Sequence, residues 1–205
     1  DIEDGSASYQ GWIYIMNPGE DPKKITDDSI KPVAGFPPQG PFTKIHWTDS
    51  GVIYFLADSQ GETFICSISE SGGMVNRIYG GNAQLTAMSL NEDNSLAAVV
   101  SISPETPSII EVVKIPGGES KKITDYNADY LSEHSLAKLD KFELERAGFR
   151  IQSRVMLPPD FDDSKKYPMI LEIHGGPNGV FTDAFNPLHQ ILANAGYIVL
   201  AVNPR

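Results

Sequence analysis

Residues 169–177 join a short apolar run to a glycine-rich turn, and they read Met169-Ile170-Leu171-Glu172-Ile173-His174-Gly175-Gly176-Pro177. The apolar run lies between Pro168 and Gly175 and is almost unbroken, which predicts a β-strand covered on both faces. Two adjacent glycines let backbone N–H groups approach a ligand without a Cβ atom in the way. The stretch therefore predicts a buried strand that ends in a loop able to stabilise an anion.

The residues on either side predict an α/β sheet. Apolar residues recur at helical spacing from Asp183 to Ala195, and Gly196 ends that helix. Residues 197–202 form a second apolar strand, which we expect to lie at an open edge of the sheet. Strand, helix and strand in this order predict a right-handed parallel crossover. Earlier in the chain, residues 142–145 and 149–157 predict a hairpin, so this half reads as the opening of an α/β sheet.

Residues 44–79 alternate short strands with Gly and Asp turns, which predicts an antiparallel meander about as long as one propeller blade. The same order recurs over residues 85–124, with a Pro-bounded loop after Ser101, and the peptide Lys-Lys-Ile-Thr-Asp stands at both 23–27 and 121–125. Repetition at this spacing predicts radially arranged blades. An ordinary antiparallel sandwich is the alternative. Closed propellers need about four to eight blades, so we expect earlier blades to be missing from this chain.

The change of pattern along the chain predicts two domains. Residues 27–42 are rich in proline and read as an irregular loop, whereas the strand rhythm gives way to polar sequence after Asp125. Since the chain starts at Asp1 and stops soon after an apolar run, we expect a fragment. The expected parts are the C-terminal blades of a β-propeller over residues 1–126, a linker over 127–138, and the N-terminal part of an α/β domain over 139–205.

Composition argues against several classes of function. The net charge of −11 argues against nucleic acid as a partner and gives no support for an anionic membrane surface. The sequence holds no run of about 18 apolar residues and no signal-peptide pattern. Cys66 is the single cysteine, so no intrachain disulfide and no paired-thiolate metal site can form. We expect Cys66 to be a small buried side chain in a strand, and the single cysteine favours a reducing, cytoplasmic compartment.

Candidate nucleophiles and metal ligands are also few. The sequence contains no G-x-S-x-G nucleophile elbow. Ser153 and Ser164 lie in a predicted strand and a polar loop without the elbow glycines, so neither is expected to act as a nucleophile. His46, His134 and His189 show no metal-ligand spacing, and we expect structural or surface roles for them. The sequence thus predicts neither a metal nor a cofactor.

Two stretches carry a family resemblance, and they read Lys165-Lys166-Tyr167-Pro168-Met169-Ile170-Leu171-Glu172-Ile173-His174-Gly175-Gly176-Pro177 and Gly196-Tyr197-Ile198-Val199-Leu200-Ala201-Val202-Asn203-Pro204-Arg205. They resemble the start of the catalytic domain in the prolyl oligopeptidase family of serine peptidases, and most of all its acylaminoacyl-peptidase-like and dipeptidyl-peptidase-like branch. Residues 123–127 also resemble that family's passage from propeller to hydrolase. The resemblance implies a β-propeller that caps an α/β-hydrolase domain and admits short peptides. The implied chemistry is attack by serine, with histidine as base and aspartate as orienter.

The resemblance also assigns roles beside the apolar strand. It implies that the backbone N–H of Gly176 donates to the oxyanion and that Gly175 permits the turn. His174 precedes any nucleophile, whereas the chain order in this fold is Ser, Asp, His, so we expect His174 to order the loop rather than to act as the base. The triad would lie beyond Arg205, and we expect the 205 residues alone to be inactive. Ala147-Gly148 stands where the family commonly has Asp-Gly, which keeps a residue suited to positive φ.

Two other functions stay open at this point. An oxyanion loop serves any acyl transfer, so an esterase on the same scaffold is one alternative. A binding protein built on a propeller, with a non-catalytic α/β region, is the other. The sequence leaves the peptide specificity and the oligomeric state undecided.

Overall fold

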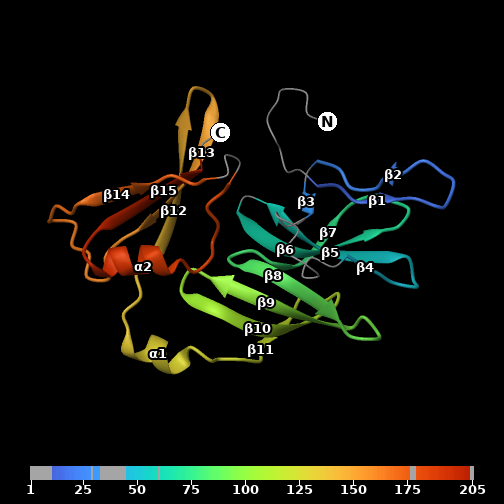
Figure 1. Cartoon of the computed structure of the whole chain (residues 1–205), viewed down its shortest axis with the longest axis horizontal. Helices are drawn as coiled ribbons and strands as arrows, with labels where there is room; N and C mark the ends of the chain where they lie inside the picture. Colours follow the sequence, from blue (N-terminus) through green and yellow to red (C-terminus); the bar gives the residue numbers. More distant parts are fainter. Residues whose placement is uncertain (1–10, 29, 33–44, 60, 176–178, 204–205) are drawn as a thin grey trace. The chain divides into compact units, whose positions relative to one another are not determined.

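The computed structural model describes residues 11–203, apart from 29, 33–44, 60 and 176–178. The chain divides into two compact units: Asp1–Ile102 with Ser108–Asp125, and Ser103–Pro107 with Tyr126–Arg205. Strands make up most of the regular structure of the described residues (Figure 1). Within these ranges, no helix is both long and apolar enough to cross a membrane.

The first unit contains a sheet built as an antiparallel meander. Its strands are β4 (His46–Trp47), β5 (Val52–Ser59), β6 (Glu62–Ser69) and β7 (Asn76–Gly80), with β3 (Lys31–Pro32) also paired to β5. The meander predicted for residues 44–79 is confirmed over its described part. β3 corrects the prediction that residues 27–42 form only an irregular loop, because proline is tolerated in an edge strand. Residues 33–42 of that stretch lie outside the described part.

A second, four-stranded sheet repeats the arrangement. Its order is β11-β10-β9-β8, with β8 (Gln84–Leu90), β9 (Leu96–Ser103), β10 (Thr106–Lys114) and β11 (Ser120–Lys122). β9 and β10 run further than predicted, so Pro104-Glu105 joins them directly where the sequence indicated a loop after Ser101. A short antiparallel pair, β1 (Tyr14–Ile15) and β2 (Lys23–Lys24), precedes both sheets.

Apolar side chains cover both faces of β5 and β6. Phe55 and Cys66 lie in a cluster with Ile13 and Ile25, on the side of β1 and β2. Neighbouring positions along the same strands point the other way, since side chains alternate along a strand. Leu56 and Ile65 accordingly pack against residues of the β8–β11 sheet. Each fully buried side chain of this size contributes about 1.5–3 kcal/mol, so these two clusters are the main stabilising core of the unit.

Cys66 is fully buried in β6, as the sequence predicts. Burial raises the pKa of its thiol from the ordinary 9.0 to about 12, and Arg77 offsets part of this effect. We therefore expect no reaction with an aromatic disulfide reagent at about pH 8 in the folded chain and full reaction in urea, because the reactive thiolate does not form while the thiol is buried. The raised pKa also means that the thiol's contribution to stability is present below pH 9.0 and is lost as the pH rises toward 12. Rapid labelling of the native chain would contradict the burial.

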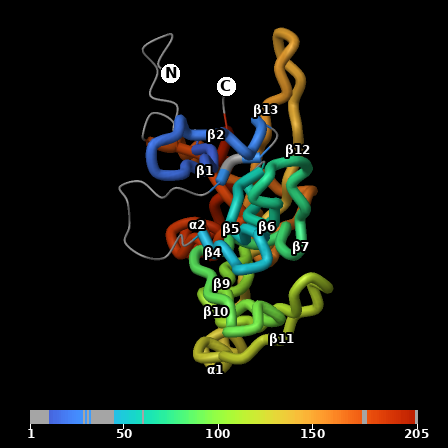
Figure 2. Tube along the Cα trace, turned by 90° about the vertical axis from the view of Figure 1, so that its right-hand side faces the viewer, coloured from blue at the N-terminus to red at the C-terminus, as the bar shows by residue number. Residues whose placement is uncertain are grey.

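The second unit contains a mixed sheet with two helices. Its elements are α1 (Ala128–Glu133), β12 (Leu139–Arg146), β13 (Phe149–Met156), β14 (Met169–Glu172), α2 (Pro187–Asn194) and β15 (Ile198–Asn203). The strand order is β12-β13-β15-β14, and β14 and β15 are parallel. The predicted parallel pairing after a crossover helix is confirmed. Figures 1 and 2 show the β12–β13 hairpin extending beyond the rest of its sheet.

Two expectations for this unit are wrong. β15 is not an open edge, because it lies between β13 and β14, and the edge strands of this sheet are β12 and β14. The helix expected from Asp183 begins only at Pro187, because the Asn186 side chain accepts hydrogen bonds from the N–H groups of Leu188 and His189 and caps the helix there. The short helix α1 lies within the stretch 127–138 that the sequence predicts as a linker.

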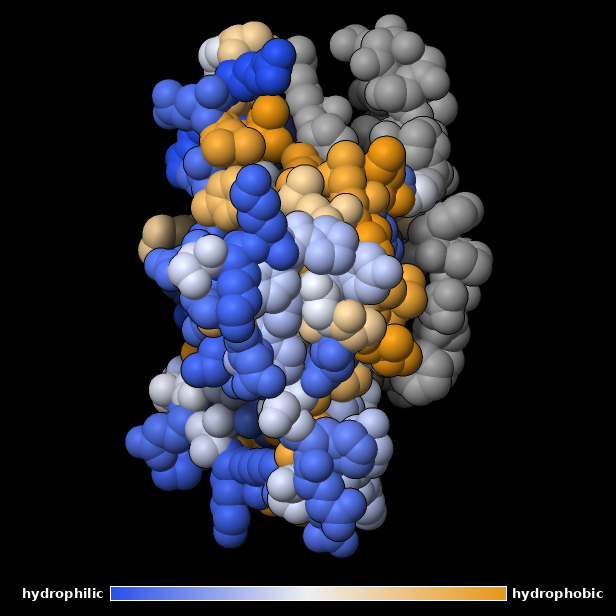
Figure 3. Space-filling model, turned by 90° about the vertical axis from the view of Figure 1, so that its left-hand side faces the viewer, coloured by the Kyte–Doolittle hydropathy of each residue, from blue (hydrophilic) through white to orange (hydrophobic). Residues whose placement is uncertain are grey.

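The sheet of the second unit has one face packed against α2 and one apolar face without such cover among the described residues. Met156, Val199 and Ala193 form a buried cluster on the α2 side. On the other face, Met169 and Leu171 of β14 are 60% and 54% exposed, which contradicts the prediction of a strand covered on both faces. Figure 3, which views the molecule from the side of β14 in Figure 1, shows apolar side chains gathered on the surface.

Candidate functional site

The candidate site lies where β14 and β15 end. Parallel strands have their carboxyl ends at the same edge of a sheet, which is where ligands bind in open α/β sheets. His174 and Gly175 follow β14 at this edge, and Asn203 is the last residue of β15. Gly176 and Pro177, which the sequence places in the oxyanion loop, lie outside the described residues. The site is therefore built from the residues on both sides of them.

Gly179 closes the loop that begins at Gly175. Its N–H group donates to the carbonyl oxygen of Gly175 at 3.0 Å. A Cβ atom on Gly179 would lie 2.3 Å from that oxygen, whereas one on Gly175 would meet nothing within 4 Å. The close approach therefore requires glycine at 179, a position that the sequence analysis missed. The Asn178-Gly179 dipeptide was the available signal, because Asn-Gly is typical of turns.

The side chain of His174 lies beside the loop. It is half-buried, and its Nδ1 atom is 3.3 Å from the carbonyl oxygen of Gly175. The edge of its ring also meets the ring of Phe181, with 5.6 Å between centroids. The His174 ring thus contacts residues on both sides of the loop, and its role in ordering the loop stays a prediction.

The side chain of Asn203 binds the backbone of Phe181, two residues after Gly179. Its Oδ1 atom accepts a hydrogen bond of 2.7 Å from the backbone N–H of Phe181. Its Nδ2 atom donates to the carbonyl oxygen of Phe181 at 3.0 Å. One carboxamide thus satisfies both backbone groups of a residue 22 positions earlier in the chain.

His189 and Glu172 join α2 to β14. The Nε2 atom of His189 contacts the Oε2 atom of Glu172, and the His189 side chain is only 8% exposed. The structural role expected for His189 agrees with this burial. Glu172 was the sequence signal for the pairing, because it interrupts an otherwise apolar strand and needs a partner when it faces a helix.

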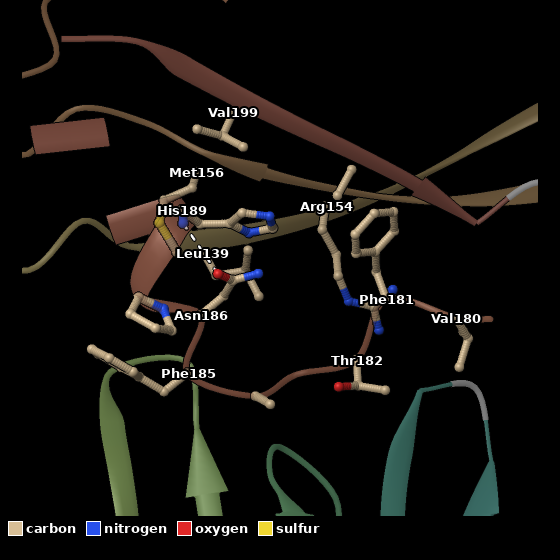
Figure 4. Close-up of a pocket in the computed structure, with 13 residues that line it drawn as sticks. Leu139, Arg154, Met156, Val180, Phe181, Thr182, Phe185, Asn186, His189 and Val199 are labelled. Atoms are coloured by element: carbon tan, nitrogen blue, oxygen red, sulfur yellow. Dashed lines mark hydrogen bonds between the residues drawn. The ribbon is translucent and has the colours of Figure 1, made fainter. Parts of the chain in front are cut away.

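Asp183 anchors the segment between the loop and α2. It pairs with Arg154 Nε at 2.9 Å and with Lys141 Nζ at 2.6 Å. The side chains of Asp183 and Arg154 are 2% and 4% exposed, so this is a buried ion pair. Next to it lies a cavity of about 260 Å³, lined by Arg154, Phe181 and Phe185 among others (Figure 4).

The remaining candidates are not brought together with this loop by any contact in the described residues. Ser153 is buried in β13, and its hydroxyl has no hydrogen-bond partner there. The Ser164 hydroxyl donates to Asp162 in an exposed turn. His46 lies 3.4 Å from the carbonyl oxygen of Met88, and His134 stacks on Tyr130. The described part of the chain shows no group of three potential metal ligands.

No family model matches the chain. Among curated proteins, the uncharacterized peptidase YuxL of Bacillus subtilis is 32% identical over 162 residues, which are 78% of this chain and 24% of the relative. Dipeptidyl-peptidase 5 of Porphyromonas gingivalis is also 32% identical, over 163 residues with the same coverage of each chain. This chain thus spans about a quarter of the length of these relatives.

A solved acylaminoacyl peptidase of Pyrococcus horikoshii has a similar fold. Its TM-score is 0.76 at 22% identity, over 96% of this chain and 28% of that protein. A second acylaminoacyl peptidase structure, with a peptide chloromethyl ketone bound, gives a TM-score of 0.77 at 23% identity. The curated relatives are named as a peptidase and a dipeptidyl-peptidase, and the solved acylaminoacyl peptidases share the fold of this chain.

Proposed function

We propose that this chain is a segment of a longer serine peptidase, in which it joins the last blades of a β-propeller to the first strands of an α/β-hydrolase domain. The proposed parts are the blades over residues 1–126, a linker over 127–138 and the hydrolase part over 139–205. The whole enzyme hydrolyses short peptides with a Ser-Asp-His triad that lies outside this segment. The segment alone is inactive.

One observation carries the proposal: the glycine loop at the carboxyl end of β14, closed by the hydrogen bond from Gly179 to Gly175. The loop follows a parallel strand and precedes the crossover helix α2, which is the position of the oxyanion loop in α/β-hydrolases. Two four-stranded meanders before it support the propeller.

In the proposed reaction, the serine oxygen attacks the peptide carbonyl and negative charge develops on the carbonyl oxygen. The backbone N–H of Gly176 donates to that oxygen, and Gly175 and His174 shape the loop that presents it. Donors of this kind contribute about 3–4 kcal/mol to the transition state, because they are oriented before the reaction begins. The histidine of the triad takes the serine proton and gives it to the leaving amine.

The exposed apolar face of β14 supports a longer sheet. Parallel strands occur almost only where helices cover both faces. α2 covers one face, and Met169 and Leu171 lie on the other. Further helices of the proposed hydrolase domain bury these residues in the whole enzyme.

The test is a full-length version of the protein treated with a fluorophosphonate probe, which forms a covalent bond with an activated serine. We expect covalent labelling, and hydrolysis of a peptide anilide that the probe abolishes. The isolated 205-residue chain is the matched negative control, and it is expected to show neither labelling nor turnover.

The alternatives give different outcomes in the same assay. An esterase would be labelled and would hydrolyse activated esters but no peptide anilide. A propeller-based binding protein would show no labelling at full length. Turnover by the isolated chain that a serine-directed inhibitor abolishes would contradict the placement of the triad outside it.

A further inference from the structure

We propose that Asn203 is a positioning residue that fixes the backbone of Phe181 and, through it, His174 and Gly179 on either side of the glycine loop, and this role rests on the proposed function. Asn203 lies at the end of β15, beside the strand that carries the loop. Its carboxamide reaches across to the backbone of Phe181, where the loop ends. Asn203 touches no substrate in this proposal and acts through the loop.

The geometry of the contact accounts for the choice of asparagine. The carboxamide presents an acceptor and a donor together, and both are used, at 2.7 Å and 3.0 Å. Aspartate at the same length offers two acceptors when ionised, so it would face the Phe181 carbonyl with a like partial charge. Alanine would leave both backbone groups of Phe181 without these partners. The pair of bonds therefore depends on this side chain rather than on polarity alone.

The described residues at the two ends of the loop contact one another. Its first part is closed by the bond from Gly179 to Gly175, and His174 rests against the ring of Phe181. The segment from Val180 to Phe185 borders a cavity of about 260 Å³, so it is not packed solidly against the sheet. Asn203 fixes the backbone of Phe181, and two residues later Asp183 is held by its ion pair with Arg154.

Loss of the Asn203 contact therefore lets Phe181 move, and with it the support of His174 and the closure at Gly179. Misplacement of a catalytic donor by about 1 Å costs on the order of 10²-fold in rate. The loss should appear in kcat more than in KM, because an oxyanion donor binds the transition state more strongly than the substrate.

The experiment compares Asn203→Ala and Asn203→Asp with the wild type in the full-length protein. Active sites are titrated with the fluorophosphonate probe, so that kcat is expressed per active enzyme. We expect kcat to fall about 10- to 100-fold while KM changes less than about threefold. A peptide aldehyde, which forms a tetrahedral adduct, should bind more weakly by a similar factor.

Asn194→Ala is the matched control. Asn194 also donates to a backbone carbonyl, that of Gln190, but it does so within α2 and away from the loop. The Asn194→Ala variant should lose this side-chain-to-backbone hydrogen bond without a change in kcat per active site.

Asn203→Asp keeps the acceptor for Phe181 N–H and gives a second readout. Its kcat relative to wild type should rise as the pH is lowered toward the pKa of the new carboxyl group, because the protonated form regains a donor for the carbonyl. If Asn203→Ala does not fold, this pH profile decides the question.

Two results overturn the proposal in different ways. A labelled, active wild type with unchanged kcat per site in the Asn203 variants would remove the role of Asn203 and leave the proposed function intact. A wild type that is neither labelled nor active would remove the proposed function, and the role of Asn203 with it.

Discussion

Replacement of Asp183 with alanine should lower the free energy of unfolding of the second unit by about 3–5 kcal/mol. The Asp183 carboxylate accepts from Arg154 and Lys141, and its side chain and that of Arg154 are almost completely buried. Removal of the carboxylate leaves a buried guanidinium without this partner, which costs far more than the loss of an exposed pair. Urea unfolding followed by circular dichroism measures the change.

Glu143→Ala is the control for this variant. Glu143 pairs with Arg150 on the exposed part of the β12–β13 hairpin, and both side chains are well solvated. Solvent weakens such pairs, so the control should unfold as the wild type does. Faster hydrogen exchange in β13 and β15 of Asp183→Ala would locate the loss beside the ion pair. A stability equal to that of the control would show that the buried pair does not hold this segment.

Strand positions were predictable because side-chain alternation is a local property. The meander over residues 44–79 follows from alternation between neighbours two positions apart, and the strands around α2 follow from short apolar runs, which are equally local. The place of β15 inside the sheet does not follow from local sequence, because it depends on pairing with β13, from Met156 with Val199 to Gln152 with Asn203. Local sequence therefore indicates a strand without giving its neighbours.

The start of α2 was predictable but was placed too early. Apolar spacing extends back to Phe185, yet Asn186 followed by Pro187 is a cap and first-turn pattern that marks the true start. Asp183 lies before that cap and serves the ion pair with Arg154 instead. The apolar spacing alone therefore placed the start of the helix too early, because the Asn186 cap and Pro187 decide where the helix begins.

The candidate site was predictable only in part. The loop is recognisable from Gly175-Gly176, which are adjacent in sequence. Its anchor at Asn203 was not, because it joins two residues 22 positions apart. The need for glycine at position 179 was not predictable either, because it arises from the close approach of Gly179 to the Gly175 carbonyl oxygen in the folded chain.

The largest expected effect on activity follows from Gly179. In Gly179→Ala, the new Cβ atom would lie 2.3 Å from the carbonyl oxygen of Gly175 and 3.3 Å from Nδ1 of His174. The first distance is far inside van der Waals contact and involves backbone, so the loop must open and the bond from Gly179 to Gly175 must lengthen. The loop that presents the proposed oxyanion donor cannot keep its shape.

We expect kcat of the proposed full-length peptidase to fall about 10²- to 10³-fold in Gly179→Ala, which is the loss seen when an oxyanion donor is removed. KM should change little, because the donor acts mainly in the transition state. Gly117→Ala is the control, since a Cβ atom there meets nothing within 4 Å and its φ is not positive. Steady-state kinetics on a peptide anilide, with titrated active sites, measures both. An unchanged kcat in Gly179→Ala would mean that this loop does not present the oxyanion donor, because the clash leaves the loop no way to keep its present geometry.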